Sequence, residues 1–318
     1  MARIAPETAA DKAVRRLVQA NLDAAGIACR RIEHGRDGAA MHELRVSLRR
    51  LRVALRAYAP FVAAGVPHKL RRRLRAVSHA TGDVRDAEVQ LEWIDSLRPG
   101  AGVAQRPGRR WVRAQLAARR RTAVRRVRQA ALPEFRQLDR RIRHRLGQKA
   151  LASCGKGSAA RAGFAGAAAP HVRRHLAVLA GQLGRIGSVR DMAGAHAARI
   201  TAKRLRYLIE PLVRGKEADA VIGPLRELQD SLGKLHDRQV MARTLARLRK
   251  SGVRKEPDGD LMPGLRWLAL RNREEAAMLH EKIRRRYLDQ SARTLLRSQR
   301  EFVRRLTAGF TPIRMEKH

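Results

Sequence analysis

The sequence predicts an all-α protein made of two helical bundles related by an internal duplication. Three observations lead to this fold class. Alanine, leucine and arginine dominate the composition, apolar residues recur at three- and four-residue steps, and two blocks of sequence occur twice in the same order. Alternation of β-branched residues is nearly absent, so we expect helix along most of the chain and no strand.

Five interruptions divide the helical pattern. They lie at Pro60–Pro67, Arg98–Gly108, Leu132–Pro133, Ser153–Pro170 and Gly252–Gly264. The stretch rich in glycine, alanine and serine is the expected linker, residues 151–170. It separates a first helical half, residues 1–150, from a second, residues 171–318, and the two halves together form one domain.

The chain is strongly basic and yet able to fold. It has 318 residues, with 70 Lys+Arg against 29 Asp+Glu, a formal net charge of +41, and 44% hydrophobic residues. Such an excess of charge destabilises the compact state unless a polyanion neutralises it. The expected partner is therefore nucleic acid, an acidic membrane surface or inorganic polyphosphate, and charge alone does not choose among them.

The cysteines and the N-terminal sequence indicate a cytoplasmic protein. Cys29 and Cys154 stand apart from any metal-ligand grouping, which fits a reducing compartment. The N-terminal residues lack the apolar core of a signal peptide, and no run approaches the roughly 20 apolar residues of a membrane span. We expect no membrane anchor.

The duplication is carried by two matched blocks. "HELRVSLRRLR" from His42 matches "HAARITAKRLR" from His196, and "LRAVSHATGDVRDAEV" from Leu74 matches "LRELQDSLGKLHDRQV" from Leu225. The second match includes an aspartate, Asp86 in one half and Asp237 in the other. Two ordered blocks at nearly the same offset indicate a duplicated helical unit.

The first block places an apolar row and a basic row side by side on one helix. At about 100° per residue, the apolar row must face the core; it consists of Leu44, Leu48, Leu51 and Leu55. The basic row runs for about 20 Å beside it and consists of His42, Arg45, Arg49, Arg52 and Arg56. Arg50 falls outside this row, on the far side of the helix.

The second block repeats the arrangement with one change. Its inward row is Ala198, Ala202, Leu205, Ile209 and Leu212, and its basic row is His196, Arg199, Lys203 and Arg206. Glu210 stands where the first half has Arg56.

An arginine-rich helix face is often merely solvated, but three features favour a binding role. The segment from Arg45 to Arg56 contains no acid that would relieve repulsion. The basic row borders the core, as expected for a groove between helices. The same order in both halves lets two rows face each other and neutralise a linear polyanion from both sides, although a repeated unit could also keep them for packing.

These residues resemble the CHAD family, the conserved-histidine α-helical domain. The pattern HxxRxxxRRLR, or HxxRxxxKRLRY in the second half, is followed by a helix ending in Gly-x-x-Arg/His-Asp, and the resemblance extends from about Arg16 to Leu306. It implies two bundles around a basic channel that binds inorganic polyphosphate, and association with polyphosphate granules. The residues it assigns to binding are His42, Arg45, Arg49, Arg52, His196, Arg199, Lys203 and Arg206.

Further basic residues extend this set. Arg56 continues the first row, and the following helix adds Arg72 and Arg75, with Arg71 and His79 near them and Arg226 as the counterpart in the second half. The run from Arg119 to Arg128 could also widen the channel. For these additional residues, a solvated surface is the alternative.

Several other residues admit a structural or a functional interpretation. His42 and His196 would titrate if a bound polyanion raised their pKa, so that binding would strengthen as pH falls; a neutral ring bonded to a carbonyl is the alternative. Arg85, matched by His236, either touches ligand or caps a helix. His171 and His175 have a metal-compatible spacing, but adjacent arginines oppose a cation. The acids between Asp83 and Glu92 are expected to open a helix as caps.

No catalytic motif is present, so we expect a binding protein without metal or cofactor. Seven permanent cations in the two rows predict a logarithmic salt dependence with a slope of about −5. The first alternative is a non-specific nucleic-acid-binding protein associated with the nucleoid or with RNA, but only 3% of residues are aromatic. The second, a polyphosphate-processing enzyme, lacks acidic metal ligands in the rows.

Overall fold

The computed structural model describes residues 4–35, 38–62, 66–97, 102–152, 163–187, 191–255, 261–288 and 295–307. Over these ranges the chain is helical apart from turns and short connections, and an isolated bridge between Ala9 and Gly163 is the one β contact described. The prediction of an all-α fold is confirmed. None of the described helices is both long enough and apolar enough to cross a bilayer.

The first-half helices are α1 (Ala10–Glu33), α2 (Gly38–Ala57), α3 (Ala59–Val62), α4 (His68–Ser96), the 3₁₀ turn η1 (Val103–Gln105), α5 (Arg106–Arg126), the π turn η2 (Val127–Ala131) and α6 (Leu132–Ala152). The later helices are α8 (Phe164–Leu183), α9 (Met192–Ile209), α10 (Gly215–Lys255), α11 (Met262–Tyr287) and α13 (Arg297–Thr307).

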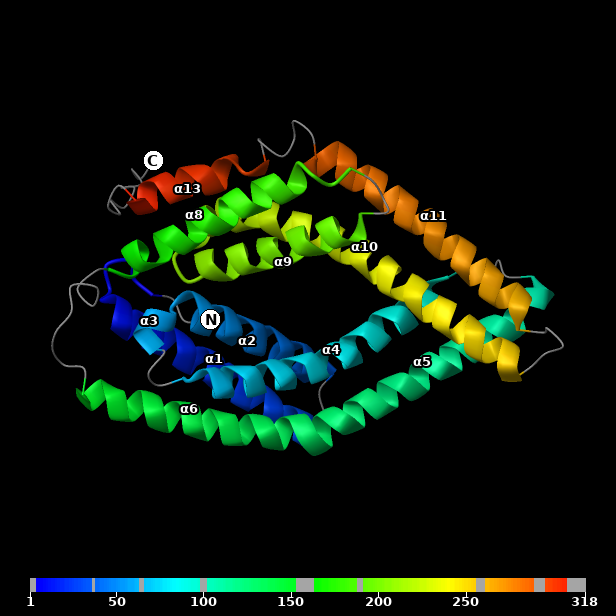
Figure 1. The fold of residues 1–318 in the computed structure, drawn as a ribbon, viewed down its shortest axis with the longest axis horizontal. Coiled ribbons are helices and arrows are strands. Elements are labelled where there is room, and N and C mark those ends of the chain that lie inside the picture. Colours follow the sequence, from blue (N-terminus) through cyan, green and yellow to red (C-terminus); the bar gives the residue numbers. More distant parts are fainter. Residues whose placement is uncertain are drawn as a thin grey trace.

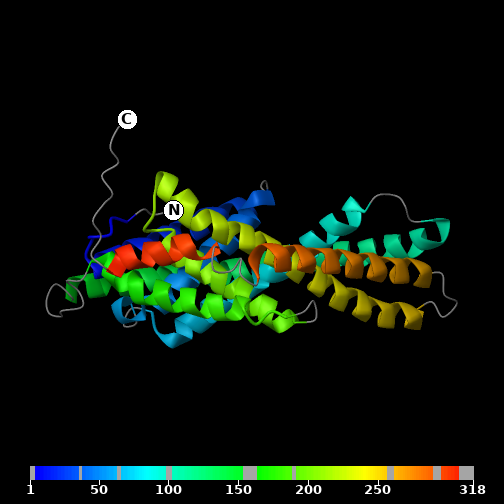
Figure 2. The ribbon, with the colours of Figure 1, turned by 90° about the horizontal axis from the view of Figure 1, so that it is seen from above.

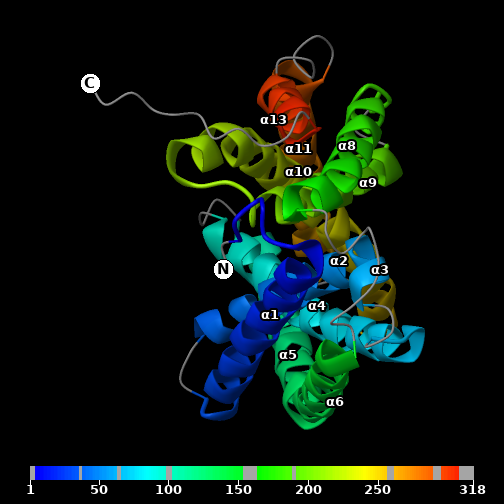
Figure 3. The same ribbon diagram turned by 90° about the vertical axis from the view of Figure 1, so that its left-hand side faces the viewer.

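The molecule is an elongated body with an arm (Figure 1). In the body, α2 and α9 lie at the centre, with α1 and α6 on one side and α8 and α13 on the other (Figures 1 and 3). The long helices α4 and α10 leave the centre and join α5 and α11 in the arm, which projects at one end of the body (Figure 2).

Two apolar cores stabilise this arrangement. The larger one includes residues of both predicted halves, from Leu22 of α1 to Phe302 of α13. The smaller one lies in the arm and joins Trp93 and Ile94 of α4 to Leu245 of α10 and Leu268 of α11. The predicted inward rows belong to the larger core, since Leu44, Leu48, Leu51, Leu55, Ala198, Ala202, Leu205, Ile209 and Leu212 are all buried. That part of the sequence prediction is confirmed.

The predicted interruption at Leu132–Pro133 is wrong, because the chain stays helical there. Helix α5 continues through the π turn η2 into α6, and the path bends at this junction (Figure 1). A proline lacks the N–H that continues a helical hydrogen-bond ladder, but it is tolerated in the first turn of a helical segment, and a π turn commonly accommodates such a local mismatch.

The predicted linker, residues 151–170, is shorter than expected. Helix α6 ends at Ala152 and α8 begins at Phe164, so both ends of that stretch are helical, while residues 153–162 lie outside the described part of the chain. Pro170 sits inside α8. Burial of Phe164 and the neighbouring alanines offsets the missing hydrogen bond, and alanine itself has the highest helix propensity.

The arm is closed by two glycines that stand opposite each other. The motif Pro-Gly-x-Arg-Trp occurs at residues 107–111 and again at residues 263–267, near the starts of α5 and α11. A Cβ on Gly108 would lie 2.9 Å from the Cα of Gly264, and a Cβ on Gly264 would lie 2.8 Å from the Cα of Gly108. The two helices can therefore approach this closely only because neither residue has a side chain.

We expect Gly108→Ala to destabilise the fold by about 2 kcal/mol, because the added methyl group meets backbone atoms that cannot rotate away. Chemical denaturation measures the loss. Gly147→Ala is the matched control, since that helical glycine has open space around its Cβ position and should gain about 0.5 to 1 kcal/mol from helix propensity. Equal stability of the two variants would contradict the close crossing.

Candidate anion-binding site between helices α2 and α9

Four cations from the two predicted basic rows come together at the centre of the body. They are Arg45 and Arg49 of α2 and Arg199 and Lys203 of α9, and we call them the central cluster. Arg49 and Arg199 both act electrostatically on Arg45, and all three arginines act on Lys203. The leucine and alanine rows dictate this meeting, because burying them turns the adjacent basic rows toward the contact between α2 and α9.

Burial and mutual repulsion make the cluster electrostatically strained. Burial lowers the pKa of Arg45 to about 10, with Arg49 and Arg199 adding to the effect. Burial, followed by the charges of Arg199, Arg49 and Arg45, lowers the pKa of Lys203 to about 6. A pKa of about 6 favours the neutral form of Lys203 at pH 7 in the ligand-free site.

Two carboxylates face the cluster, Asp86 from α4 and Asp237 from α10. Both counter the burial-driven lowering of the Arg199 pKa. The expectation that the acids of residues 83–92 open a helix is wrong, because α4 begins at His68 and they lie in its second half. The sequence signal for their real place was the match between Asp86 and Asp237 in the second repeated block.

The cluster also contains donors without acceptors. The Nε atoms of Arg45 and Arg199 are buried and make no hydrogen bond to any described residue. An unsatisfied buried donor costs about 1 to 3 kcal/mol, and more when it is charged. An anionic oxygen placed between α2 and α9 would both satisfy these donors and relieve the repulsion.

The row histidines lie beside residues of α4 and α10. Nδ1 of His196 is 3.3 Å from Nδ1 of His236, and the two rings are tilted with centroids 4.7 Å apart. Burial, then the nearby arginines, lowers the pKa of His196 and brings that of His236 to about 3. Burial, followed by Arg85, lowers the pKa of His42. The matched residues Arg85 and His236 thus lie next to the two row histidines.

The two halves differ where the rows end. In the second half, Arg206 Nη1 is 3.3 Å from Glu210 Oε1, and the guanidinium of Arg206 lies 5.0 Å from the ring centroid of Tyr207. Arg50 Nη2 reaches across from α2 to lie 2.9 Å from Glu210 Oε2. Arg206, predicted to bind the ligand, is therefore already paired, and Arg50 is bonded to the opposite half.

Comparisons with known proteins agree with this architecture. The family model of the CHAD domain matches residues 16–246, most of the chain. The chain belongs to the CHAD family. The crystal structure of the CHAD domain from the plant Ricinus communis is similar in fold, with a TM-score of 0.65, 20% sequence identity and 94% of each chain covered. A search of curated proteins found no match.

The remaining predicted residues of this CHAD domain lie on α2, α4 and α10. Arg52 donates from Nη1 to Ser78 Oγ at 3.1 Å, and Arg56 is exposed at the end of the same row. Arg75, on α4, contacts His79 through Nε at 3.4 Å and acts electrostatically on Arg52. Exposed positions on α4 and α10 hold the last two, Arg72 and Arg226.

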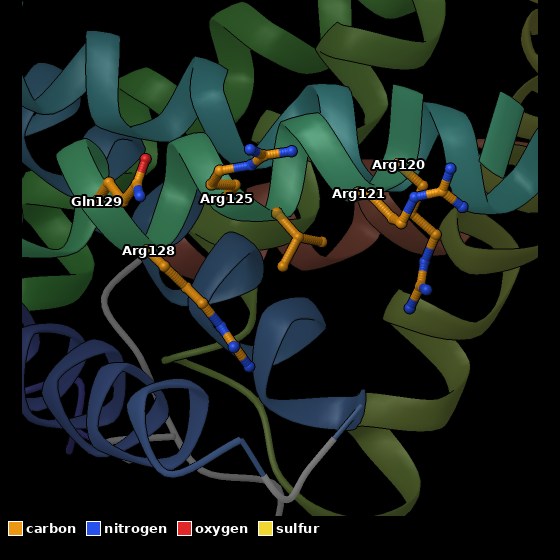
Figure 4. A pocket seen from close by; sticks show the side chains of 6 residues that line it. Arg120, Arg121, Arg125, Arg128 and Gln129 are labelled. Atoms are coloured by element: carbon orange, nitrogen blue, oxygen red, sulfur yellow. The ribbon is translucent and has the colours of Figure 1, made fainter. Parts of the chain in front are cut away.

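The run from Arg119 to Arg128 forms a groove of its own on α5 and η2. This CHAD domain has a cavity of about 470 Å³ there, lined by Arg120, Arg121, Val124, Arg125, Arg128 and Gln129. Figure 4 shows Arg128 at one end of the groove, Arg120 and Arg121 at the other, and Arg125 between them. Arg120 is 3.3 Å from Glu88 of α4.

Proposed function

We propose that this CHAD domain binds inorganic polyphosphate along the facing rows of α2 and α9. The observation that carries the proposal is the central cluster, where cations from two helices are buried together, two arginine donors are unsatisfied, and the pKa of Lys203 is lowered to about 6. An anion is the ligand that corrects all three defects at once. The resemblance to the CHAD family implies the same ligand.

A linear phosphate chain suits this geometry better than a single small anion. The row of α2 runs for about 20 Å, and a guanidinium presents paired donors that match adjacent phosphate oxygens. The site meets the ligand from two helices at once. A flexible chain with about one negative charge per phosphate can contact both rows along their length.

The proposed mechanism is charge neutralisation and counterion release, without catalysis. Asp86 and Asp237 face the central cluster, and the arginines beside them oppose the arrival of a metal cation. We place the protein in the cytoplasm, in association with polyphosphate granules.

Non-specific binding of nucleic acid is the second candidate function. The net charge of +41 and the groove lined by arginines on α5 and η2 favour contact with phosphate backbones at low salt. Such contact would involve the outer surface. It would depend little on the residues between α2 and α9.

A competition titration at physiological salt separates the two functions. We expect duplex DNA and RNA to displace labelled polyphosphate only weakly on a per-phosphate basis. The affinity should fall with salt with a logarithmic slope of about −3.5, because five arginines of the rows make no ion pair with any described residue. These arginines are Arg45, Arg49, Arg52, Arg56 and Arg199. The slope is smaller than the sequence-based one because Arg206 is paired and Lys203 is not permanently charged. Equal displacement by nucleic acid would favour the second function.

A further inference from the structure

We propose that the Arg56 end of the α2 row holds a terminal phosphate group of the chain, in a setting equivalent to the one that holds the Glu210 carboxylate in the other half. The inference rests on the proposed function and adds a direction to it. One end of the polyanion would be fixed at Arg56, and the rest would run through the central cluster toward His42 and His196.

The Glu210 site shows what this arrangement does with an anion. The carboxylate is 5% exposed and lies between Arg50, at 2.9 Å, and Arg206, at 3.3 Å. Both guanidinium groups lie against the ring of Tyr207, at 5.6 Å and 5.0 Å from its centroid. One buried anion thus neutralises two arginines, one from each half of the chain.

The repeat places the same two arginines beside the end of the α2 row, without the acid. In the matched blocks, Arg204 corresponds to Arg50 and Arg52 corresponds to Arg206, while Arg56 stands in the position of Glu210. These three residues lie close together, since Arg56 acts electrostatically on Arg204, and both act on Arg52. The pair of arginines that holds a carboxylate in one half therefore faces a third arginine in the other.

Two neighbouring elements contribute side chains to this place. Arg75 of α4 adds a positive charge that acts on Arg52. His175 of α8 lies near Arg56 and Arg204; burial, followed by the charges of the nearby arginines, lowers its pKa, so it supplies a polar ring and not a further cation. His175 is fixed there by a contact of its Nδ1 with the carbonyl oxygen of His171, at 2.8 Å. We call Arg52, Arg56, Arg75, Arg204 and His175 the terminal cluster.

A chain end is the part of polyphosphate that matches such a cluster. A terminal phosphate group carries a second ionisation with a pKa near 6, so at pH 7 it bears more charge than an internal phosphate. It also offers three oxygens to converging arginines. At the corresponding place in the second half, the two arginines are already paired with the Glu210 carboxylate.

The test compares polyphosphate with free ends and polyphosphate whose terminal groups are converted to neutral-capped phosphoramidates, both at physiological salt. We expect capping to weaken binding to the wild-type domain by on the order of 10-fold. We expect Arg56→Glu to weaken binding of the uncapped chain to the same extent, because the new carboxylate would occupy the position between Arg52 and Arg204. Its melting temperature without ligand should rise for the same reason.

Arg273→Glu is the matched control, with the same charge change at an exposed site on α11, and it should retain the preference for free ends. Equal binding of capped and uncapped chains by the wild type would overturn the inference, and that comparison needs no variant. An Arg56→Glu protein that still prefers free ends would overturn it as well. If DNA displaced polyphosphate from the wild-type domain equally well per phosphate, that result would instead refute the proposed function.

Discussion

Replacing all four residues of the central cluster by alanine is expected to lower the affinity for polyphosphate by at least about 100-fold, because each charge-assisted hydrogen bond contributes on the order of 1.5 to 3 kcal/mol. The salt slope should fall by about 2, since three permanent cations are lost. Fluorescence titration with labelled polyphosphate at several salt concentrations measures both quantities. Thermal stability without ligand should rise, because the substitutions remove buried like charges.

The control removes four cations from the exposed surface of the arm. The substituted residues are Arg247, Arg249, Lys250 and Arg273, each changed to alanine. This variant loses the same number of lysine and arginine residues as the cluster variant, so a difference between them reports on position and not on composition. If both variants bind equally well, the protein acts as a diffuse polycation, and the proposed site is wrong.

The second large effect is a pH dependence that comes from Lys203. Its ordinary pKa is 10.5, and in the ligand-free protein it is about 6. A bound polyanion raises this pKa again. At any pH between the pKa of the free protein and the higher pKa of the complex, the complex therefore holds one more proton than the free protein. Affinity should therefore rise by up to about 10-fold per unit as pH falls from 9 to 7.

Calorimetry in buffers of different ionisation enthalpy measures this proton uptake directly. We expect about one proton per bound site at pH 7.5 for the wild type, and much less for Lys203→Arg, because arginine keeps its charge in the free protein. A His42→Gln, His196→Gln variant should keep the dependence between pH 7 and 9. The pKa values of both histidines are lowered in the ligand-free state. Any contribution of these histidines to the pH dependence of binding is therefore expected below pH 7. A flat profile for the wild type would contradict the lysine mechanism.

The sequence predicted the fold and the rows because both follow from one periodicity. Once the apolar row that begins at Leu44 is buried in the core, the helical repeat places the basic row at the edge of that core. The partners of that row were harder to predict, because they come from positions far away along the chain. The pairing of Arg50 with Glu210 joins residues 160 positions apart, and no local pattern encodes it. Asp86 was misinterpreted because the acids around it resemble the first turn of a helix. Its match with Asp237 in the second repeated block was the better indication of its place.

The lengths of α4 and α10 have a consequence for how a ligand is received. The 41 residues of α10 span about 60 Å, and the 29 residues of α4 span about 43 Å. Each carries an aspartate at the central cluster and, within a few turns, side chains of the arm core. Because α4 and α10 each contribute side chains to both apolar cores, moving α2 and α9 apart would also disturb that packing. The site is thus preorganised: the energetic cost of gathering its cations falls on folding, and a polyanion meets it in the conformation that binds.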